Sequence, residues 1–247
     1  MIPDELTQPV ELEAYAALEL LRDGELSVEG RLMDASNATF YCAVSADGVA
    51  AACVYKPVAG ERPLWDFPDG TLAAREVAAF ELSAASGWDI VPPTVYRDGP
   101  LGPGMVQLWI AEDEAVDLVT LIRRRDSRPL RRVAVFDAIV NNADRKGGHL
   151  LPRAEHVYGI DHGVCLHTED KLRTVLWQWA GKRLPEDAVE MLSRLRAELE
   201  GPLCQRLSAR LSAREVRATV RRVEGLLSVA RHPEPSGDWP AVPWPPI

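Results

Sequence analysis

The chain has 247 residues, of which 47% are hydrophobic and 26% charged, a composition typical of a globular protein with one large domain or two lobes. Its net charge of −9 argues against nucleic acid as the main partner, and weakly against an anionic membrane surface. It has no apolar run of membrane-spanning length, its acidic start differs from a signal peptide, and its four cysteines form no C-x-x-C pair. We therefore expect a cytoplasmic protein with reduced thiols and no integral membrane association.

The first 110 residues combine helical and strand-like patterns. A helical period over residues 10–22 is followed by a run of strands, and Asp47-Gly48 between two apolar runs predicts a hairpin. The strands are expected at 26–32, 39–44, 50–55, 88–96 and 105–110, and a second helix at 72–86. Five strands and one main helix indicate a small antiparallel lobe.

The rest of the chain is mainly helical. An acidic linker at residues 111–114 follows the last strand, and amphipathic patterns then predict helices at 116–124, 129–142, 185–199 and 202–230. The last residues, rich in proline and tryptophan, are expected to pack in extended form or to be disordered. The expected parts are therefore 1–110, 111–231 and 232–247.

Two acidic loops stand out in the helical part. Residues 136–151 read FDAIVNNADRKGGHLL, so an apolar helix leads Asn142 and Asp144 into a glycine-containing loop. A second turn, GIDHG, carries Asp161. Two carboxylates on neighbouring loops suit phosphoryl transfer, in which one Asp orients the attacking hydroxyl and the other holds the Mg²⁺ that bridges the nucleotide phosphates.

These loops resemble those of atypical kinases. NADR at 142–145 with His149, followed by IDHG at 160–163, is similar to the N-x-D-R-H-x-x-N and D-x-G patterns of phosphoinositide kinases and bacterial HipA-type kinases. The whole chain also resembles an actinobacterial group labelled phosphatidylinositol 3-/4-kinase-like. Lys146 stands where the pattern has His, and His149 stands where it has a metal-binding Asn. Because imidazole is a softer ligand than an amide oxygen, His149 is expected either to favour Mn²⁺ or to hydrogen-bond within its loop.

The resemblance implies an α+β, two-lobed protein-kinase-like fold. Its N-lobe would hold the small antiparallel β-sheet with one main helix, and its C-lobe would be mostly helical. It also implies ATP and Mg²⁺ as cofactors, with Mn²⁺ as an alternative. Lys56, at the end of the third strand, would neutralise the α/β-phosphates and pair with an acid on the next helix, where Glu76 is favoured over Glu81.

The resemblance assigns further roles in the two acidic loops. Asp144 would orient the acceptor hydroxyl, and Asp161 would bind the metal. Asn142 would fix the loop or assist the metal, and Arg145 would pair with Asp144 or with a phosphate. His149 is the candidate ligand of a second ion.

Nucleotide-binding candidates lie in the first 110 residues. Ser36 and Asn37 occupy the link between the first two strands, where a kinase holds the phosphates, although a solvated turn explains them equally well. The adenine edge would bond the backbone at the end of the fifth strand. The candidates there are Gln107, Leu108 and Trp109.

The sequence therefore predicts an ATP-dependent phosphotransferase that transfers the γ-phosphate to a hydroxyl of an inositol-type compound, a lipid or a protein Ser/Thr. One alternative is a nucleotide-binding pseudokinase that acts as a regulatory or interaction module, and another is an atypical kinase that transfers AMP. A third combines His149, His162 and His167 with the two Asp residues in a transition-metal hydrolase site. The H-x-H or i, i+4 spacing that such hydrolases use is absent from these histidines.

Overall fold

The computed structural model describes residues 14–32, 37–111, 113 and 116–246. Contacts divide the chain into two compact units, the first made of Met1–Val77 and Pro92–Ala111 and the second of Ala78–Val91 and Glu112–Ile247. Helix α2 (Leu72–Ser86) therefore begins in the first unit and ends in the second. We expected all of residues 78–91 in the N-terminal lobe, but Ala78, Leu82 and Trp88 belong to the apolar core of the second unit.

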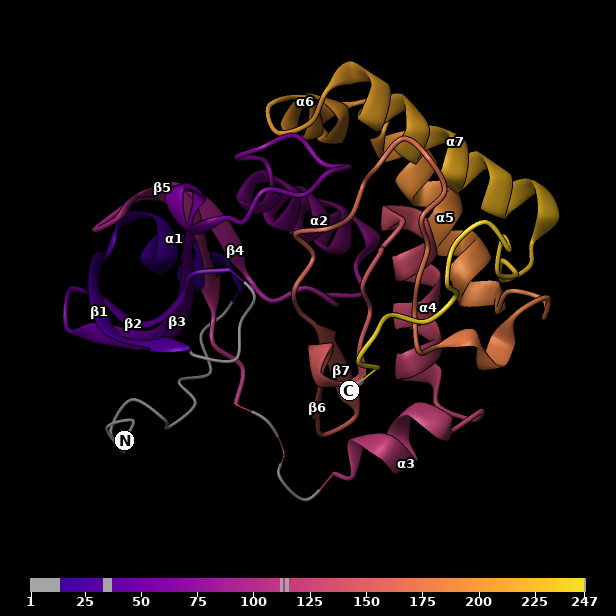
Figure 1. Cartoon of the computed structure of the whole chain (residues 1–247), viewed down its shortest axis with the longest axis horizontal. Coiled ribbons are helices and arrows are strands. Elements are labelled where there is room, and N and C mark those ends of the chain that lie inside the picture. The colour runs from indigo at the N-terminus through magenta and orange to yellow at the C-terminus, as the bar shows by residue number, and fades with distance from the viewer. Residues whose placement is uncertain (1–13, 33–36, 112, 114–115, 247) are drawn as a thin grey trace. The chain divides into compact units, whose positions relative to one another are not determined.

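The first unit is built on a five-stranded antiparallel sheet with the order β1-β2-β3-β5-β4 (Figure 1). Asp47 and Gly48 form the predicted hairpin turn, with φ of 50° and 79°, the positive values that a two-residue hairpin loop requires. The strand expected over 88–96 begins only at Thr94. The strands are β1 (Glu25–Leu32), β2 (Thr39–Ala46), β3 (Val49–Pro57), β4 (Thr94–Gly99) and β5 (Gly102–Leu108).

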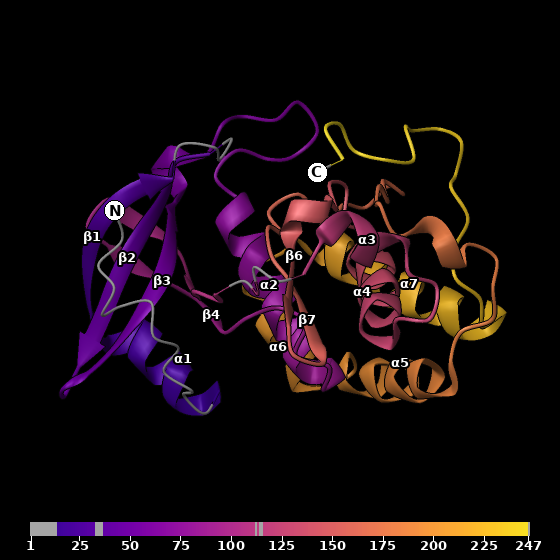
Figure 2. The same ribbon diagram turned by 90° about the horizontal axis from the view of Figure 1, so that it is seen from below.

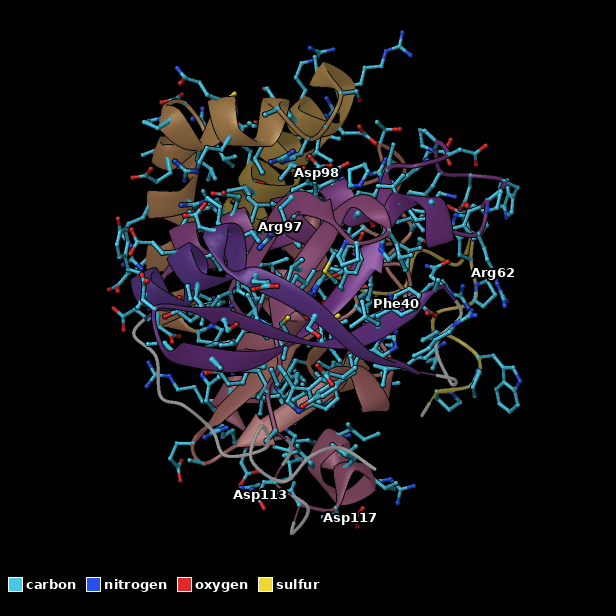
Figure 3. The ribbon with its side chains drawn as sticks, turned by 90° about the vertical axis from the view of Figure 1, so that its left-hand side faces the viewer. Phe40, Arg62, Arg97, Asp98, Asp113 and Asp117 are labelled. Atoms are coloured by element: carbon cyan, nitrogen blue, oxygen red, sulfur yellow. The ribbon has the colours of Figure 1, made fainter. Side chains whose placement is uncertain are left out.

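Helix α1 (Ala14–Asp23) packs on this sheet (Figure 2). Its Leu20 and Leu21 join an apolar core with side chains of the strands, among them Val44, Tyr55 and Val106. Arg97 of β4 lies at the C-terminal end of the helix and donates hydrogen bonds to the carbonyls of Leu21 at 3.0 Å and Gly24 at 2.7 Å (Figure 3). A cation at this end compensates the helix dipole and satisfies carbonyls that lack helical partners.

Helix α4 (Arg128–Val140) is the central element of the second unit, and every residue from Val133 to Val140 is buried. Ser127 begins it by accepting a hydrogen bond from the Leu130 N–H, and Asn141 ends it in the left-handed conformation. Helices α5 and α7 lie alongside it (Figures 1 and 2). The other helices of this unit are α3 (Leu118–Arg123), α5 (Glu186–Glu198), α6 (Pro202–Ser208) and α7 (Ala213–Val229).

Two local features of the second unit differ from the prediction. The single helix expected over 202–230 is divided into α6 and α7, because Ser212 and Glu215 form a capping box that starts a new helix. A short hairpin of β6 (Leu150–Arg153) and β7 (His156–Gly159) connects the two acidic loops. In the part of the chain that the structure describes, no helix has the length and apolar character needed to traverse a lipid bilayer.

Candidate active site

In the first unit, Lys56 near the end of β3 forms an ion pair with Glu76 of α2. The Lys56 Nζ lies 2.6 Å from Glu76 Oε1, and the two side chains are 19% and 2% exposed. Glu81, the alternative partner, instead pairs with Arg206 at 2.6 Å in the second unit. Because Glu76 is almost fully buried, its carboxylate holds the lysine ammonium in one place, and the Lys56 side chain is still partly exposed.

The loop that follows β3 bonds both the start of α2 and Asn37, which precedes β2. The Glu61 carboxylate accepts hydrogen bonds from the first N–H groups of α2, those of Leu72 at 3.0 Å and Ala73 at 2.8 Å. The Asn37 amide oxygen accepts from the Arg62 N–H at 2.9 Å, so this side chain holds two loops together. Ser36, the other predicted phosphate ligand, lies outside the described residues.

At the end of β5, two backbone N–H groups are already bonded within the protein. The N–H groups of Leu108 and Trp109 donate to the carbonyls of Pro93 at 2.9 Å and Ala52 at 3.0 Å. The Gln107 side chain is buried and donates to Thr94 Oγ1 at 2.8 Å. These two N–H groups are thus bonded within the protein, and binding of an adenine edge by the backbone of residues 107–109 stays a prediction.

In the second unit, Asn142 shapes the loop that carries Asp144. Its side-chain NH₂ donates to Asp137 Oδ1 at 3.0 Å, and its amide oxygen accepts from the Asp144 N–H at 2.9 Å. Asn142 is fully buried, whereas Asp144 is only half-buried. Both polar ends of Asn142 are thus used to turn the chain after α4, which supports its predicted role in fixing the loop.

The Arg145 guanidinium joins the two acidic loops. It forms a fully buried ion pair with Asp137, with Nη2 and Oδ1 3.0 Å apart, and donates to the carbonyls of His149 at 3.2 Å and Ile160 at 2.8 Å. The buried His162 ring also lies against it, with Nε2 at 2.7 Å from Nη2. The predicted pair between Arg145 and Asp144 is wrong. The guanidinium instead binds the carboxylate of Asp137, which lies in the last turn of α4.

The two carboxylates lie within electrostatic reach of each other. Burial raises the pKa of Asp144, the Lys146 ammonium 3.2 Å away lowers it, and the charge of Asp161 raises it. Asp161 takes a left-handed conformation with φ of 61°, and its Oδ2 lies 3.4 Å from His149 Nε2. The second unit therefore brings together three of the predicted residues, Asp144, Asp161 and His149.

The other two histidines of the hydrolase alternative, His162 and His167, bond other groups of the protein. The His162 ring contacts Arg145, and His167 Nδ1 accepts a hydrogen bond from the Glu169 N–H at 3.0 Å. Among the described residues, no group of three or more His, Cys, Asp or Glu side chains has the arrangement of a metal site. A cation at Asp161 would therefore need oxygen ligands from a phosphate and from water, which is how Mg²⁺ is usually held.

Comparison with known proteins gives one close relative. No family model matches the chain. It is 46% identical over 262 residues to the protein Rv2133c of Mycobacterium tuberculosis, and the match covers 92% of this chain and 94% of the mycobacterial protein. The chain belongs to the family of Rv2133c.

Solved structures show the fold of this Rv2133c relative. The Golgi casein kinase with Mn and ADP bound matches with a TM-score of 0.57 and 15% identity, covering 88% of this chain and 75% of that one. A Fam20 structure from hydra, with bound sugar, matches with a TM-score of 0.57 and 14% identity, covering 90% and 89%. At these identities the likeness concerns the fold alone. The predicted α+β, kinase-like fold is confirmed.

Sequence reasoning missed two residues of the candidate site. Asp137 was treated as part of the helix leading to the loop, although an acid among the apolar residues of a buried helix signals a buried partner. Lys146 was noted only as a departure from the kinase pattern, and it is the cation beside Asp144. Its position two residues after Asp144 was the available signal.

Proposed function

We propose that this chain is an ATP-dependent phosphotransferase of the atypical kinase type that transfers the γ-phosphate to a hydroxyl group. The observation that carries this proposal is the proximity of Asp144 and Asp161 on two loops joined by the Arg145 guanidinium. One carboxylate would orient the hydroxyl, and the other would bind the cation that neutralises the phosphates. The kinase-like fold supports this assignment.

Residues of the first unit would bind the nucleotide. Lys56 supplies positive charge for the α/β-phosphates, and the buried Glu76 carboxylate keeps its ammonium in place. Ser36 and Asn37 would lie along the phosphates, and the backbone of residues 107–109 would bind the adenine edge. These assignments are supported by the order of the residues along β2, β3, α2 and β5.

The donor set in the second unit suits a hard divalent cation. Asp161 has a 43% exposed side chain, so its carboxylate can reach a cation while phosphate oxygens and water complete the shell. When bound, the cation would neutralise charge on the transferred phosphoryl group. The His149 imidazole beside Asp161 favours Mn²⁺ over Mg²⁺, and the Golgi casein kinase structure contains Mn with ADP.

For the phosphate acceptor, we propose a chemical class. The phosphoinositide-kinase resemblance of the two loops favours an inositol-type hydroxyl, free or as a lipid headgroup. The net charge of −9 favours a free compound or a protein Ser/Thr over an anionic membrane surface. Assays with each class, using ATP labelled in either the α- or the γ-phosphate, separate these acceptors and also distinguish phosphate transfer from AMP transfer.

Glu76→Gln should lower kcat/KM for ATP by about 10- to 100-fold, because it removes a charged hydrogen bond to Lys56. The matched control is Glu81→Gln, on the same helix, whose partner is Arg206 and whose turnover should stay within about twofold of wild type. Steady-state ATP turnover with Mg²⁺ or Mn²⁺ measures both. Equal losses in the two variants would contradict the assigned role of Glu76.

Lys146→Ala should move the acid limb of the activity profile to higher pH. Burial raises the pKa of Asp144, and the Lys146 ammonium lowers it. Because Asp144 must be ionised to accept the hydroxyl proton, activity falls as the pH drops through this pKa. Removing the ammonium raises the pKa of Asp144 further, so the loss of activity moves to higher pH. The measurement is kcat against pH, with the exposed Lys182→Ala as control, and an unchanged limb in Lys146→Ala would contradict the role of Asp144 as a base.

A regulatory pseudokinase is the second candidate. It is favoured by one observation, the His149 imidazole against Asp161 at the position where related kinases use Asn. Nucleotide binding measured by calorimetry, together with turnover under Mg²⁺ and under Mn²⁺, distinguishes the two functions. Tight ATP binding without transfer to any acceptor class would establish the regulatory module and reject the phosphotransferase.

A further inference from the structure

Three segments of the second unit that are far apart in sequence are joined by backbone hydrogen bonds. The Arg145 N–H donates to the Arg173 carbonyl at 3.0 Å, and the Val175 N–H donates to the Arg145 carbonyl at 3.1 Å. These bonds hold the loop of Asp144 against the residues that follow the Asp161 turn. They form a short parallel bridge between positions 145 and 174.

The C-terminal segment is attached to both of these segments. The Thr174 N–H donates to the Ala241 carbonyl at 3.1 Å, and the Trp177 Nε1–H donates to the same carbonyl at 2.7 Å. The Gly147 N–H donates to the Pro246 carbonyl at 2.8 Å. Figures 1 and 2 both show the segment returning from the end of α7 toward β6 and β7.

Side chains fix the segment at its start. The Lys171 ammonium lies 4.2 Å from the centroid of the Trp239 ring, and its side chain is only 3% exposed, a geometry in which a cation–π contact is strengthened by desolvation. The Arg173 Nε–H donates to the Pro240 carbonyl at 3.1 Å, and Pro243 is buried. Trp244, by contrast, is 86% exposed. The prolines reduce the chain entropy that this extended packing costs.

The hydrogen bond from the Gly147 N–H to the Pro246 carbonyl lies in the loop between Asp144 and His149. Residues Gly147–His149 form a single 3₁₀ turn, and the first N–H of such a turn has no acceptor within it. Pro246 supplies that acceptor to a buried residue, between Asp144 and His149 in the chain. His149 is the last residue of this turn, and Asp144 lies three residues before its first residue, Gly147.

We propose that residues 239–246 are a positioning element of the candidate active site, holding the 144–149 loop and the 173–177 segment in register. This inference rests on the proposed phosphotransfer for its catalytic consequence, but its structural part does not. A displacement of about 1 Å at a reacting group costs on the order of 10²-fold in rate, so loosening the segment should lower kcat far more than it changes KM for ATP.

The test uses three full-length variants. Trp239→Ala removes the contact with Lys171, and Trp177→Phe keeps an aromatic ring but removes the N–H that bonds the Ala241 carbonyl. Trp65→Ala is the matched control, because it removes an exposed Trp that lies in the first unit, outside residues 239–246. Hydrogen exchange followed by mass spectrometry reports on the amides of 144–149, and steady-state turnover gives kcat and KM.

We expect exchange at 144–149 to become at least about 10-fold faster in the first two variants and to stay unchanged in the control. Turnover should fall by about 10-fold or more through kcat, with KM for ATP within about threefold. Wild-type exchange in Trp239→Ala and Trp177→Phe would overturn the proposal. If wild type itself transfers no phosphate, the proposed function fails, and the exchange data still decide whether the segment holds the loop.

Discussion

Replacing Asp161 with Asn should lower the rate of phosphoryl transfer by about 10³-fold or more under Mg²⁺. The substitution removes the negative charge that would hold the cation and through it the transferred phosphate. It keeps the size of the side chain and suits the left-handed backbone at φ of 61°, which Asn tolerates as well as Asp. The loss should therefore appear in kcat, with the protein still folded, and is measured by steady-state turnover with the preferred acceptor.

Asp89→Asn provides the control for this variant. Asp89 is exposed, lies in the same unit and has φ of 48°, so the same atoms change on the same kind of backbone at a residue outside the two acidic loops. Its turnover should match that of wild type. If Asp161→Asn retained wild-type turnover, Asp161 would have no role in holding the cation, and the assignment of the second acidic loop would have to be abandoned.

Arg145→Met should destabilise the protein by about 3–5 kcal/mol. The variant leaves the fully buried Asp137 carboxylate without its cation, and breaking a buried ion pair from one side costs this much because the remaining charge stays desolvated. The carbonyls of His149 and Ile160 also lose a donor. Urea unfolding followed by circular dichroism gives the change in the free energy of unfolding.

Two further variants test the reason for this loss. Arg145→Lys keeps the charge but loses the planar fork that reaches Asp137 and both carbonyls, so its stability should fall between those of wild type and Arg145→Met. Arg124→Ala removes an exposed pair with Asp126 and should leave the unfolding midpoint unchanged. A loss of less than about 1 kcal/mol in Arg145→Met would contradict the stabilising role assigned to the buried Arg145–Asp137 pair.

Much of the candidate site is encoded in short stretches of sequence. Asp47-Gly48 is sufficient for the first hairpin because both residues tolerate positive φ. Glu76 and Glu81 lie five positions apart, so a helix turns them to different sides and only one can meet Lys56. These features depend on backbone preferences and helical periodicity, which act over a few residues.

Other parts of the site depend on backbone hydrogen bonds between distant segments, which no local sequence pattern indicates. The N–H groups of Leu108 and Trp109 are used by Pro93 and Ala52, and backbone bonds of this kind are independent of side-chain identity. For the same reason, nothing in the sequence of the C-terminal segment indicates that Pro246 bonds Gly147. The sequence prediction therefore assigned this segment to extended packing against the body or to disorder, without naming the residues that it contacts.

Residue type, residue order and the resemblance to atypical kinases led the sequence prediction to Lys56, Asp144 and Asp161 as candidates, because phosphoryl transfer uses charged groups and these leave a mark in the sequence. The partners that orient those groups were decided by the tertiary structure. Arg145 was expected to pair with Asp144 or with a phosphate, yet its guanidinium binds Asp137, because a buried cation goes to the carboxylate that is buried with it. Burial is a property of the packed chain, and it determines which charges pair.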